Sequence, residues 1–346
     1  MRKRKTTTLY DLAQHVGYAK STVSYVMNGK GSEMGVAQKT IGKIKTAAKE
    51  LGYVPNYWAS SLARRPPGIV SVLLHGLSGD WGDHVVSSLS RVLKKKSYTP
   101  FLAVDWDDPE LFEQEMSTIL QRQDAGVFCH SFVGTVEQYA RITDSGIPLV
   151  FLGDIPEGFE RVPGAGSVAW DDGRAARRAV EHLAGIGRKK IAFVGVDHGL
   201  LSDRHRYAAY EQVVAEAGQP IKEEWKVFLK RESFSYTSIR ENMIRLSALG
   251  EEAPDAIFAM NDAIGMNVLL ALKELGIRVP DDIAVIGMGD LPLCQFAELS
   301  TVKEPLEQLG ETAALMMLER IECPSKEAQH RKICSNELAI RQSTGG

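Results

Sequence analysis

The stretch from Thr7 to Asn28 reads TTLYDLAQHVGYAKSTVSYVMN, and it decides the fold of the N-terminal part. Thr8 followed by Asp11 is typical of a helix start, because a threonine caps free backbone N–H groups and an acid suits the first turn. Four apolar residues then repeat at helical spacing: Leu9, Leu12, Ala13 and Val16. Gly17 can adopt a left-handed backbone and end this first helix.

A second helix is predicted from Lys20 to Asn28. Val23 and Val26 are expected to face inward. The outward positions then fall to side chains that suit base edges and phosphates: Lys20, Ser21, Ser24 and Tyr25. The pair is a helix-turn-helix, with an ordinary helical hairpin as the alternative, since the motif is short and degenerate.

A third helix is predicted from about Ala37 to Leu51, closed by Gly52. The segment behind it, residues 50–56, reads ELGYVPN, with Ala59 and Leu62 further on. Together with residues 7–28, this segment resembles the DNA-binding head of the lactose and galactose repressor family. The match covers the whole head.

Charge is distributed unevenly along the chain. Residues 1–65 hold 12 Lys or Arg and 3 Asp or Glu, a net charge of +9, whereas the remainder holds 29 and 41, a net charge of −12. Such asymmetry is the expected footprint of a module that binds a polyanion, attached to something else.

Composition narrows the class of protein. The basic N-terminus is followed by no apolar stretch, which argues against a secretory signal, and no apolar run approaches a membrane span. The four cysteines are scattered and show no metal-ligand spacing: Cys129, Cys294, Cys323 and Cys334. We expect a cytoplasmic protein with reduced thiols, without metal, cofactor or membrane partner.

The remaining 280 or so residues alternate strand and helix patterns. Short apolar runs recur at residues 69–74, 101–104, 126–128, 149–152, 168–170, 190–195, 256–260 and 283–287, with amphipathic stretches between them such as 85–96 and 174–184. This pattern predicts an α/β fold with doubly wound parallel sheets. Ligands bind beyond the carboxyl ends of such strands, so the polar residues there are site candidates: Asp105, Asp154, Asp171, Asp172, Asn261, Asp262 and Asp290.

The family resemblance extends over nearly the whole chain, through matches such as residues 182–192, 275–283 and 337–344. It implies a helix-turn-helix head with a hinge helix in residues 1–65. It implies a two-lobed domain like a periplasmic binding protein in residues 66–346, which binds an effector and forms the dimer. By that analogy the first lobe spans about 68–168 plus 298–328.

The resemblance also implies DNA contacts. Lys20, Ser21 and Tyr25 would lie at base edges, and phosphates would be held by Thr8, Tyr10, Thr22, Ser24 and Asn28. Residues 56–63 resemble the family's hinge helix, in which Asn56 and Ala59 contact DNA and Leu62 enters the minor groove and kinks the duplex. Family members usually carry Arg where this chain has Tyr25, so the base read there is open; covering the helix surface is the alternative role.

Effector contacts are implied for Trp81, Asp171, Arg206, Phe234, Asn261 and Asp290. An arginine offers a planar fork to carboxylates or hydroxyls, and Asn261 can donate and accept. The alternatives are a core role for the aromatics, a helix cap for the acid, and a structural ion pair for Arg206. Two segments depart from the family: Gly289 replaces an acid that often contacts effector, and residues 79–82 read GDWG. Neither lactose-like nor purine-like chemistry therefore carries over.

These observations predict a homodimeric transcriptional regulator, expected to be a repressor. It binds a near-palindromic double-stranded operator under the control of a small effector, expected to be a carbohydrate. A nucleobase or other co-repressor is the alternative within the same architecture. A solute-binding transport component fits the lobes but not the basic head. An α/β enzyme is disfavoured because the nucleophile elbow, P-loop, zinc-protease and dinucleotide motifs are missing.

Overall fold

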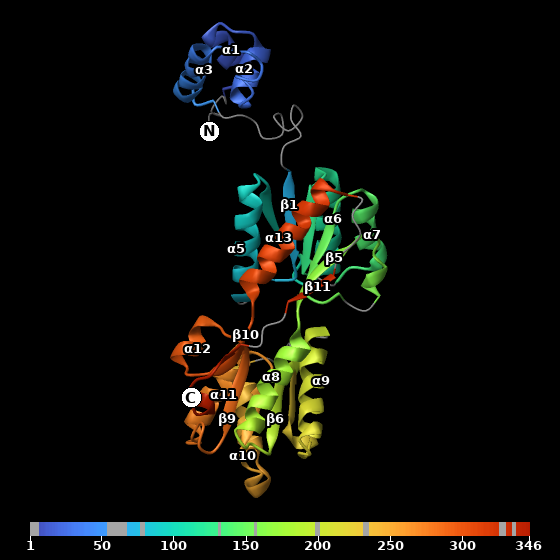
Figure 1. Ribbon diagram of the computed structural model, residues 1–346, viewed down its shortest axis with the longest axis vertical. Helices are drawn as coiled ribbons and strands as arrows, with labels where there is room; N and C mark the ends of the chain where they lie inside the picture. Colours follow the sequence, from blue (N-terminus) through green and yellow to red (C-terminus); the bar gives the residue numbers. More distant parts are fainter. Residues whose placement is uncertain are drawn as a thin grey trace. The chain divides into compact units, whose positions relative to one another are not determined.

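The structure is a computed structural model that describes residues 7–53, 68–76, 80–130, 133–155, 158–197, 201–230, 235–324, 330–333 and 337–346. The chain divides into two units, Met1–Gly68 and Ile69–Gly346, which are described separately (Figure 1). The predicted hinge helix, with Asn56, Ala59 and Leu62, lies outside the described residues.

The first unit is a bundle of three helices: α1 (Leu9–Val16), α2 (Lys20–Met27) and α3 (Gln38–Glu50). Thr8 caps α1 through a reciprocal pair of bonds, in which its Oγ1 accepts from Asp11 N and its N–H donates to the Asp11 carboxylate. Gly17 ends the helix with φ +73, a left-handed backbone that residues with a Cβ rarely adopt. Both features confirm the helix start and end predicted from the sequence.

A single apolar core holds this bundle together. Leu12, Val23 and Ile44 are almost completely buried, one from each helix, and further aliphatic side chains surround them. Because α1 and α2 are each only 8 residues long, neither would be stable alone in water. Packing around this core therefore fixes the angle between the helices.

The second unit contains two six-stranded sheets. The first has the order β11-β5-β4-β3-β1-β2 and is parallel throughout, with strands β1 (Ile69–Leu74), β2 (Thr99–Val104), β3 (Gly126–His130), β4 (Leu149–Leu152), β5 (Gly166–Trp170) and β11 (His330–Ile333). The second has the order β12-β10-β9-β8-β6-β7 and is parallel except at β12, with strands β6 (Ile191–Asp197), β7 (Lys226–Lys230), β8 (Ala256–Ala259), β9 (Ala284–Gly289), β10 (Ser300–Lys303) and β12 (Leu338–Ala339).

Helices cover both faces of each sheet (Figure 1). The first lobe has α5 (Asp80–Lys95), α6 (Pro109–Arg122), α7 (Val136–Asp144) and α13 (Leu306–Glu322); the second has α8 (Asp172–Gly185), α9 (Leu201–Glu216), α10 (Tyr236–Ser247), α11 (Asp262–Glu274) and α12 (Pro292–Phe296). Short 3-10 helices occupy Phe159–Arg161, Glu223–Trp225, Gly250–Glu252 and Gln342–Thr344.

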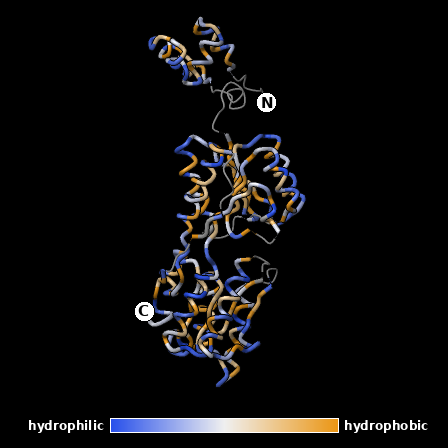
Figure 2. Tube along the Cα trace, turned by 45° about the vertical axis from the view of Figure 1, so that its right-hand side comes forward, coloured by the Kyte–Doolittle hydropathy of each residue, from blue (hydrophilic) through white to orange (hydrophobic). Residues whose placement is uncertain are grey.

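Strand β1 is buried on both faces. Val72 packs into the core on the side of α5 and α13, and Leu73 packs into the core on the side of α6 and α7. Burial of both faces explains the continuous apolar run of this strand. Figure 2 shows the apolar strands between more hydrophilic helices.

The expected limits of the first lobe are wrong at their C-terminal end. The family resemblance implies that residues 298–328 belong to that lobe, yet β10 lies in the second sheet, where Ser300 pairs with Ile286 of β9. Conversely β11 lies in the first sheet, where His330 pairs with Ser167 of β5. The chain therefore crosses between lobes after β5, after β10 and after β11. No helix among the described residues is long and apolar enough to span a membrane.

The core of the first unit can be tested at Leu12, which has no exposed surface. We expect Leu12→Ala to cost about 2–5 kcal/mol, because truncating a buried leucine leaves a cavity. Hydrogen exchange of the full chain should then show faster exchange in α1–α3 and unchanged exchange in the two sheets. Gln14→Ala, at an exposed position of the same helix, is the matched control. Equal protection of α1–α3 in both variants would contradict the assigned core.

Candidate functional site

The outer side of α2 carries the side chains predicted to reach base edges. Lys20, Ser21 and Tyr25 are exposed, whereas Val23 and Val26 pack into the core beneath them. The Tyr25 side chain remains 38% exposed, so it does not belong to the buried core. α2 thus presents polar groups outward on a rigid base.

The residues predicted to hold phosphates differ in their exposure and in the hydrogen bonds that they already make. Tyr10 is exposed, and its hydroxyl accepts from Gln14 Nε2 at 2.8 Å. Thr22 is partly buried, and Asn28 Nδ2 donates to Ser24 Oγ at 3.2 Å. The Thr8 hydroxyl donates to Asp11 Oδ2 at 2.7 Å and so already serves the helix cap.

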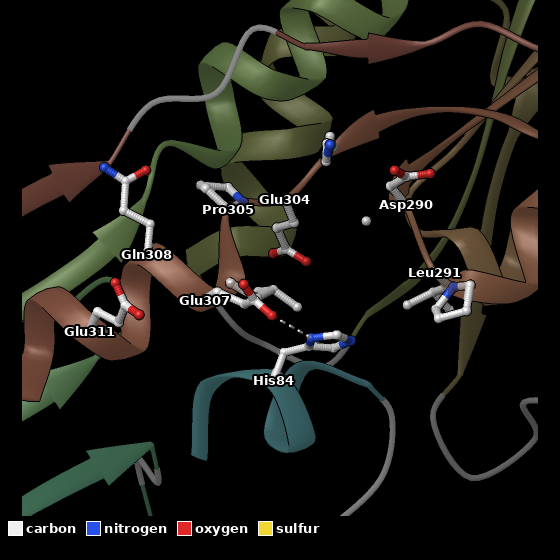
Figure 3. Close-up of a pocket in the computed structure, with 12 residues that line it drawn as sticks. His84, Asp290, Leu291, Glu304, Pro305, Glu307, Gln308 and Glu311 are labelled. Carbon is white, nitrogen blue, oxygen red and sulfur yellow. Dashed lines mark ion pairs between the residues drawn. The ribbon is translucent and has the colours of Figure 1, made fainter. Parts of the chain in front are cut away.

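In the second unit, a cavity of about 500 Å³ lies between the two lobes, next to the crossover from β10 to α13 (Figure 3). α5 and the start of α13 contribute from the first lobe, and the turn from β9 into α12 contributes from the second. The lining residues are His84, Gly289, Asp290, Leu291, Pro292, Lys303, Glu304, Pro305, Leu306, Glu307, Gln308 and Glu311. Because the lining comes from both lobes, this position favours a site whose ligand affinity depends on how the lobes are arranged.

Arg206 contacts Glu304 of the cavity lining and joins two of the crossovers. Its Nε donates to Asp172 Oδ1 at 2.6 Å and its Nη1 to the Met260 carbonyl at 2.9 Å, while Nη2 lies 3.6 Å from Glu304 Oε1. Its guanidinium also lies 5.7 Å from the centre of the Trp170 ring. Asp172 follows β5 and Glu304 follows β10, so one side chain ties together the segments that connect the lobes.

Burial governs the charges of this cluster. Burial alone would lower the pKa of Arg206, but the carboxylates of Asp172 and Glu304 outweigh it and raise that pKa. Burial raises the pKa of Glu304 to about 8, although Arg206 opposes the rise. Arg206 is therefore permanently charged, and Glu304 titrates in the neutral range.

Two predicted effector contacts serve as helix caps in this structure. Asp171 accepts from Arg174 N at 3.1 Å at the start of α8, and Asn261 accepts from Ile264 N at 2.9 Å at the start of α11. Of the other candidates, Asp154 Oδ2 lies 3.0 Å from His205 Nδ1 of the second lobe. Phe234 and the side chain of Trp81 lie outside the described residues.

Asp290 does line the cavity, where its Oδ1 accepts from Arg341 Nη2 at 2.6 Å. The departure at Gly289 has a physical reason. Its φ is +137, and a Cβ there would lie 2.9 Å from Asp262 Oδ2. The Asp262 carboxylate instead accepts from Leu291 N and Thr301 Oγ1 at 2.9 and 2.6 Å, and so fixes the turn from β9 into α12.

Sequence analysis missed Glu304, His84 and Glu307 as cavity residues. Glu304 directly follows β10, so the rule that polar residues after strands mark sites would have found it, had that strand been recognised. His84 and Glu307 carry no comparable signal, because they lie on helices of the first lobe and meet only through the packing of α5 on α13. Within the described residues, no group of three or more His, Cys, Asp or Glu side chains is arranged to hold a metal ion.

Comparison with known proteins agrees with both units. Residues 8–56 match the family described as bacterial regulatory proteins, lacI family, and residues 180–344 match the periplasmic binding protein-like domain. The transcriptional regulator DegA of Bacillus subtilis is 26% identical over 98% of each chain. The match spans both units of this chain.

Solved structures show the same architecture. A lac repressor dimer bound to operator and an anti-inducer superposes with a TM-score of 0.82 over 98% of this chain and 99% of its own, at 23% identity, which speaks for the fold alone. The regulator CelR in complex with cellobiose superposes with a TM-score of 0.70 at 25% identity, over 97% of this chain and 99% of its own. Residues 8–56 thus carry a DNA-binding domain of the lacI family, and the two-lobed body is of the periplasmic binding protein type, as in the transcriptional regulators that this chain resembles.

Proposed function

We propose that this protein is a homodimeric, cytoplasmic repressor whose affinity for a near-palindromic operator is set by a small polar effector. The observation that carries the proposal is the exposed face of α2, held on a buried core within a head of net charge +9. Residues 1–65 are the proposed DNA-binding head with its hinge helix, and residues 66–346 bind effector and dimerise. The proposed DNA contacts are those inferred from the sequence, with Thr8 acting through the start of α1.

Two apolar surfaces of the second unit support a dimer. Phe101 and Leu102 are each 42% exposed on β2, an edge strand, and Leu293 and Phe296 are 60% and 84% exposed on α12. An uncovered edge strand with large apolar side chains invites association, and burial of this surface would stabilise a pair of bodies. Two heads on one dimer would read the two halves of a palindrome.

The cavity between the lobes supports effector control. A ligand there touches the first lobe through α5 and α13 and the second lobe through the turn after β9. A ligand that binds one arrangement of the lobes more tightly shifts the population toward it, and operator DNA is then bound more or less tightly by the same coupling. The regulator CelR is solved with cellobiose, which favours a carbohydrate-like effector here.

Removing residues 1–65 tests where DNA affinity resides. We expect specific operator binding to be lost, because the net charge of the remaining chain is −12 and it lacks α2. The remaining body should still be a folded dimer by ultracentrifugation and circular dichroism. Retention of specific DNA binding by a folded body would contradict the division of roles.

Leu62→Ala tests the proposed minor-groove wedge, which lies outside the described residues. We expect specific binding to weaken more than non-specific binding, because unstacking a base step costs a few kcal/mol only where the DNA is kinked. Affinities are measured on an operator selected from random DNA and on a scrambled duplex, with Ser61→Ala as the control. Equal losses on both duplexes would refute the wedge.

Arg206→Ala tests whether this arginine binds effector as well as joining the crossovers. We expect a roughly ten- to hundredfold loss of effector affinity, since charge-assisted hydrogen bonds from Arg206 to effector hydroxyl oxygens would contribute about 1.5–3 kcal/mol. A lower melting temperature should accompany it, because Asp172 stays buried without its partner. Operator affinity without effector should change little. Arg204→Ala, at an exposed position of α9, is the control. A lower melting temperature with unchanged effector affinity would make Arg206 purely structural.

A further inference from the structure

The charged side chains that line the cavity between the lobes are mostly acidic. The lining holds four carboxylates, from Asp290, Glu304, Glu307 and Glu311, against one lysine, Lys303. In Figure 3 the Glu304 side chain extends into the space between His84 and Asp290. The charge of the residues that line a cavity determines which ligands bind there favourably.

Two of these charges are already balanced, because Asp290 pairs with Arg341 at 2.6 Å and Lys303 pairs with Glu337 at 3.3 Å. Glu307 Oε1 lies 3.9 Å from His84 Nδ1. Glu311 has no ion pair among the described residues. Glu304 shares Arg206 with Asp172, which lies closer to Arg206 Nη2, at 2.5 Å, than Glu304 does, at 3.6 Å.

Glu304 lacks hydrogen-bond donors. Only 13% of its side chain is exposed, and its ion-pair partner, Arg206 Nη2, lies 3.6 Å away, beyond hydrogen-bond distance. Two other N–H groups of Arg206 make hydrogen bonds elsewhere: Nε donates to Asp172 and Nη1 donates to the Met260 carbonyl. Among the described residues, none donates a hydrogen bond to the Glu304 carboxylate. A buried carboxylate without donors is costly, and the pKa of about 8 that burial gives Glu304 reflects that cost.

We propose that this cavity binds a small organic cation, a protonated amine whose N–H groups donate to Glu304 with Glu311 nearby. This inference rests on the proposed function, because it names the chemical class of the effector. The amine supplies the hydrogen-bond donors that Glu304 lacks and adds a positive charge to that of Arg206. The N-terminus of α13 favours an anion only weakly, and Glu304, Glu307 and Glu311 outweigh it.

Matched probes test the charge preference on the full chain. Glucosamine, glucose and glucose 6-phosphate share one ring and differ in charge, and putrescine and 1,4-butanediol form a second pair without a sugar. We expect each amine to bind at least about tenfold more tightly than its neutral counterpart by calorimetry and thermal shift, and the phosphate not to bind. Neutral or phosphorylated probes binding as tightly as the amines, or no amine binding at about 10 mM, would overturn the proposal.

Variants locate the bound amine. Glu304→Gln keeps the shape of the side chain but removes its charge, so amine affinity should fall roughly ten- to hundredfold while affinity for neutral probes is unchanged. Glu311→Gln should cause a smaller loss and does not disturb Arg206, so it covers the case in which Glu304→Gln folds poorly. Glu110→Gln, at an exposed position of α6, is the control. Unchanged amine affinity in both cavity variants would refute the site.

Operator affinity without any probe separates this inference from the proposed function. If the full chain fails to bind a selected palindrome, the proposed function is wrong, whatever the cavity binds. If it binds the palindrome but the cavity prefers neutral or anionic probes, the inference about the amine alone is wrong.

Discussion

The contact of Arg206 with Asp172 and Glu304 is the interaction on which the two-lobed body depends most. Each of these acids lies where the chain passes from one sheet to the other, and Arg206 reaches both from α9. Buried charges are stable only when they are paired, so the two crossovers cannot separate without leaving a charge uncompensated. A ligand that pairs with Glu304 would change the balance of this cluster at the point where the lobes are joined.

Gly289 and Asp262 show how a departure from a family pattern can preserve the structure while changing the site. The family resemblance implies an acid where this chain has Gly289. Here the positive φ and the nearness of the Asp262 carboxylate leave no room for a side chain. Negative charge in the cavity instead comes from Glu304 and the start of α13. Ligand chemistry taken from a relative would therefore be misplaced.

The three helices of the head could be predicted from sequence almost to their boundaries, because their signals are local. Thr8, Asp11 and Gly17 mark helix ends through bonds to nearby residues, and Val23 and Val26 follow from helical spacing. The body could be predicted only in class. β7 alternates buried and exposed residues, and β12 is only 2 residues long, so neither resembles a buried parallel strand. The cavity could not be predicted, because His84 and Glu307 come together only when α5 packs on α13. The DNA and effector contacts inferred from the sequence stay predictions.

Binding of the full chain to a whole palindrome and to a single half-site tests the central claim most directly. If two heads of one dimer read two half-sites, a labelled palindrome should titrate with two chains per duplex, and removing one half-site should weaken binding by well over tenfold. A saturating amine probe should then shift the affinity for the palindrome. Equal affinity for palindrome and half-site, with one chain per duplex, would contradict the account.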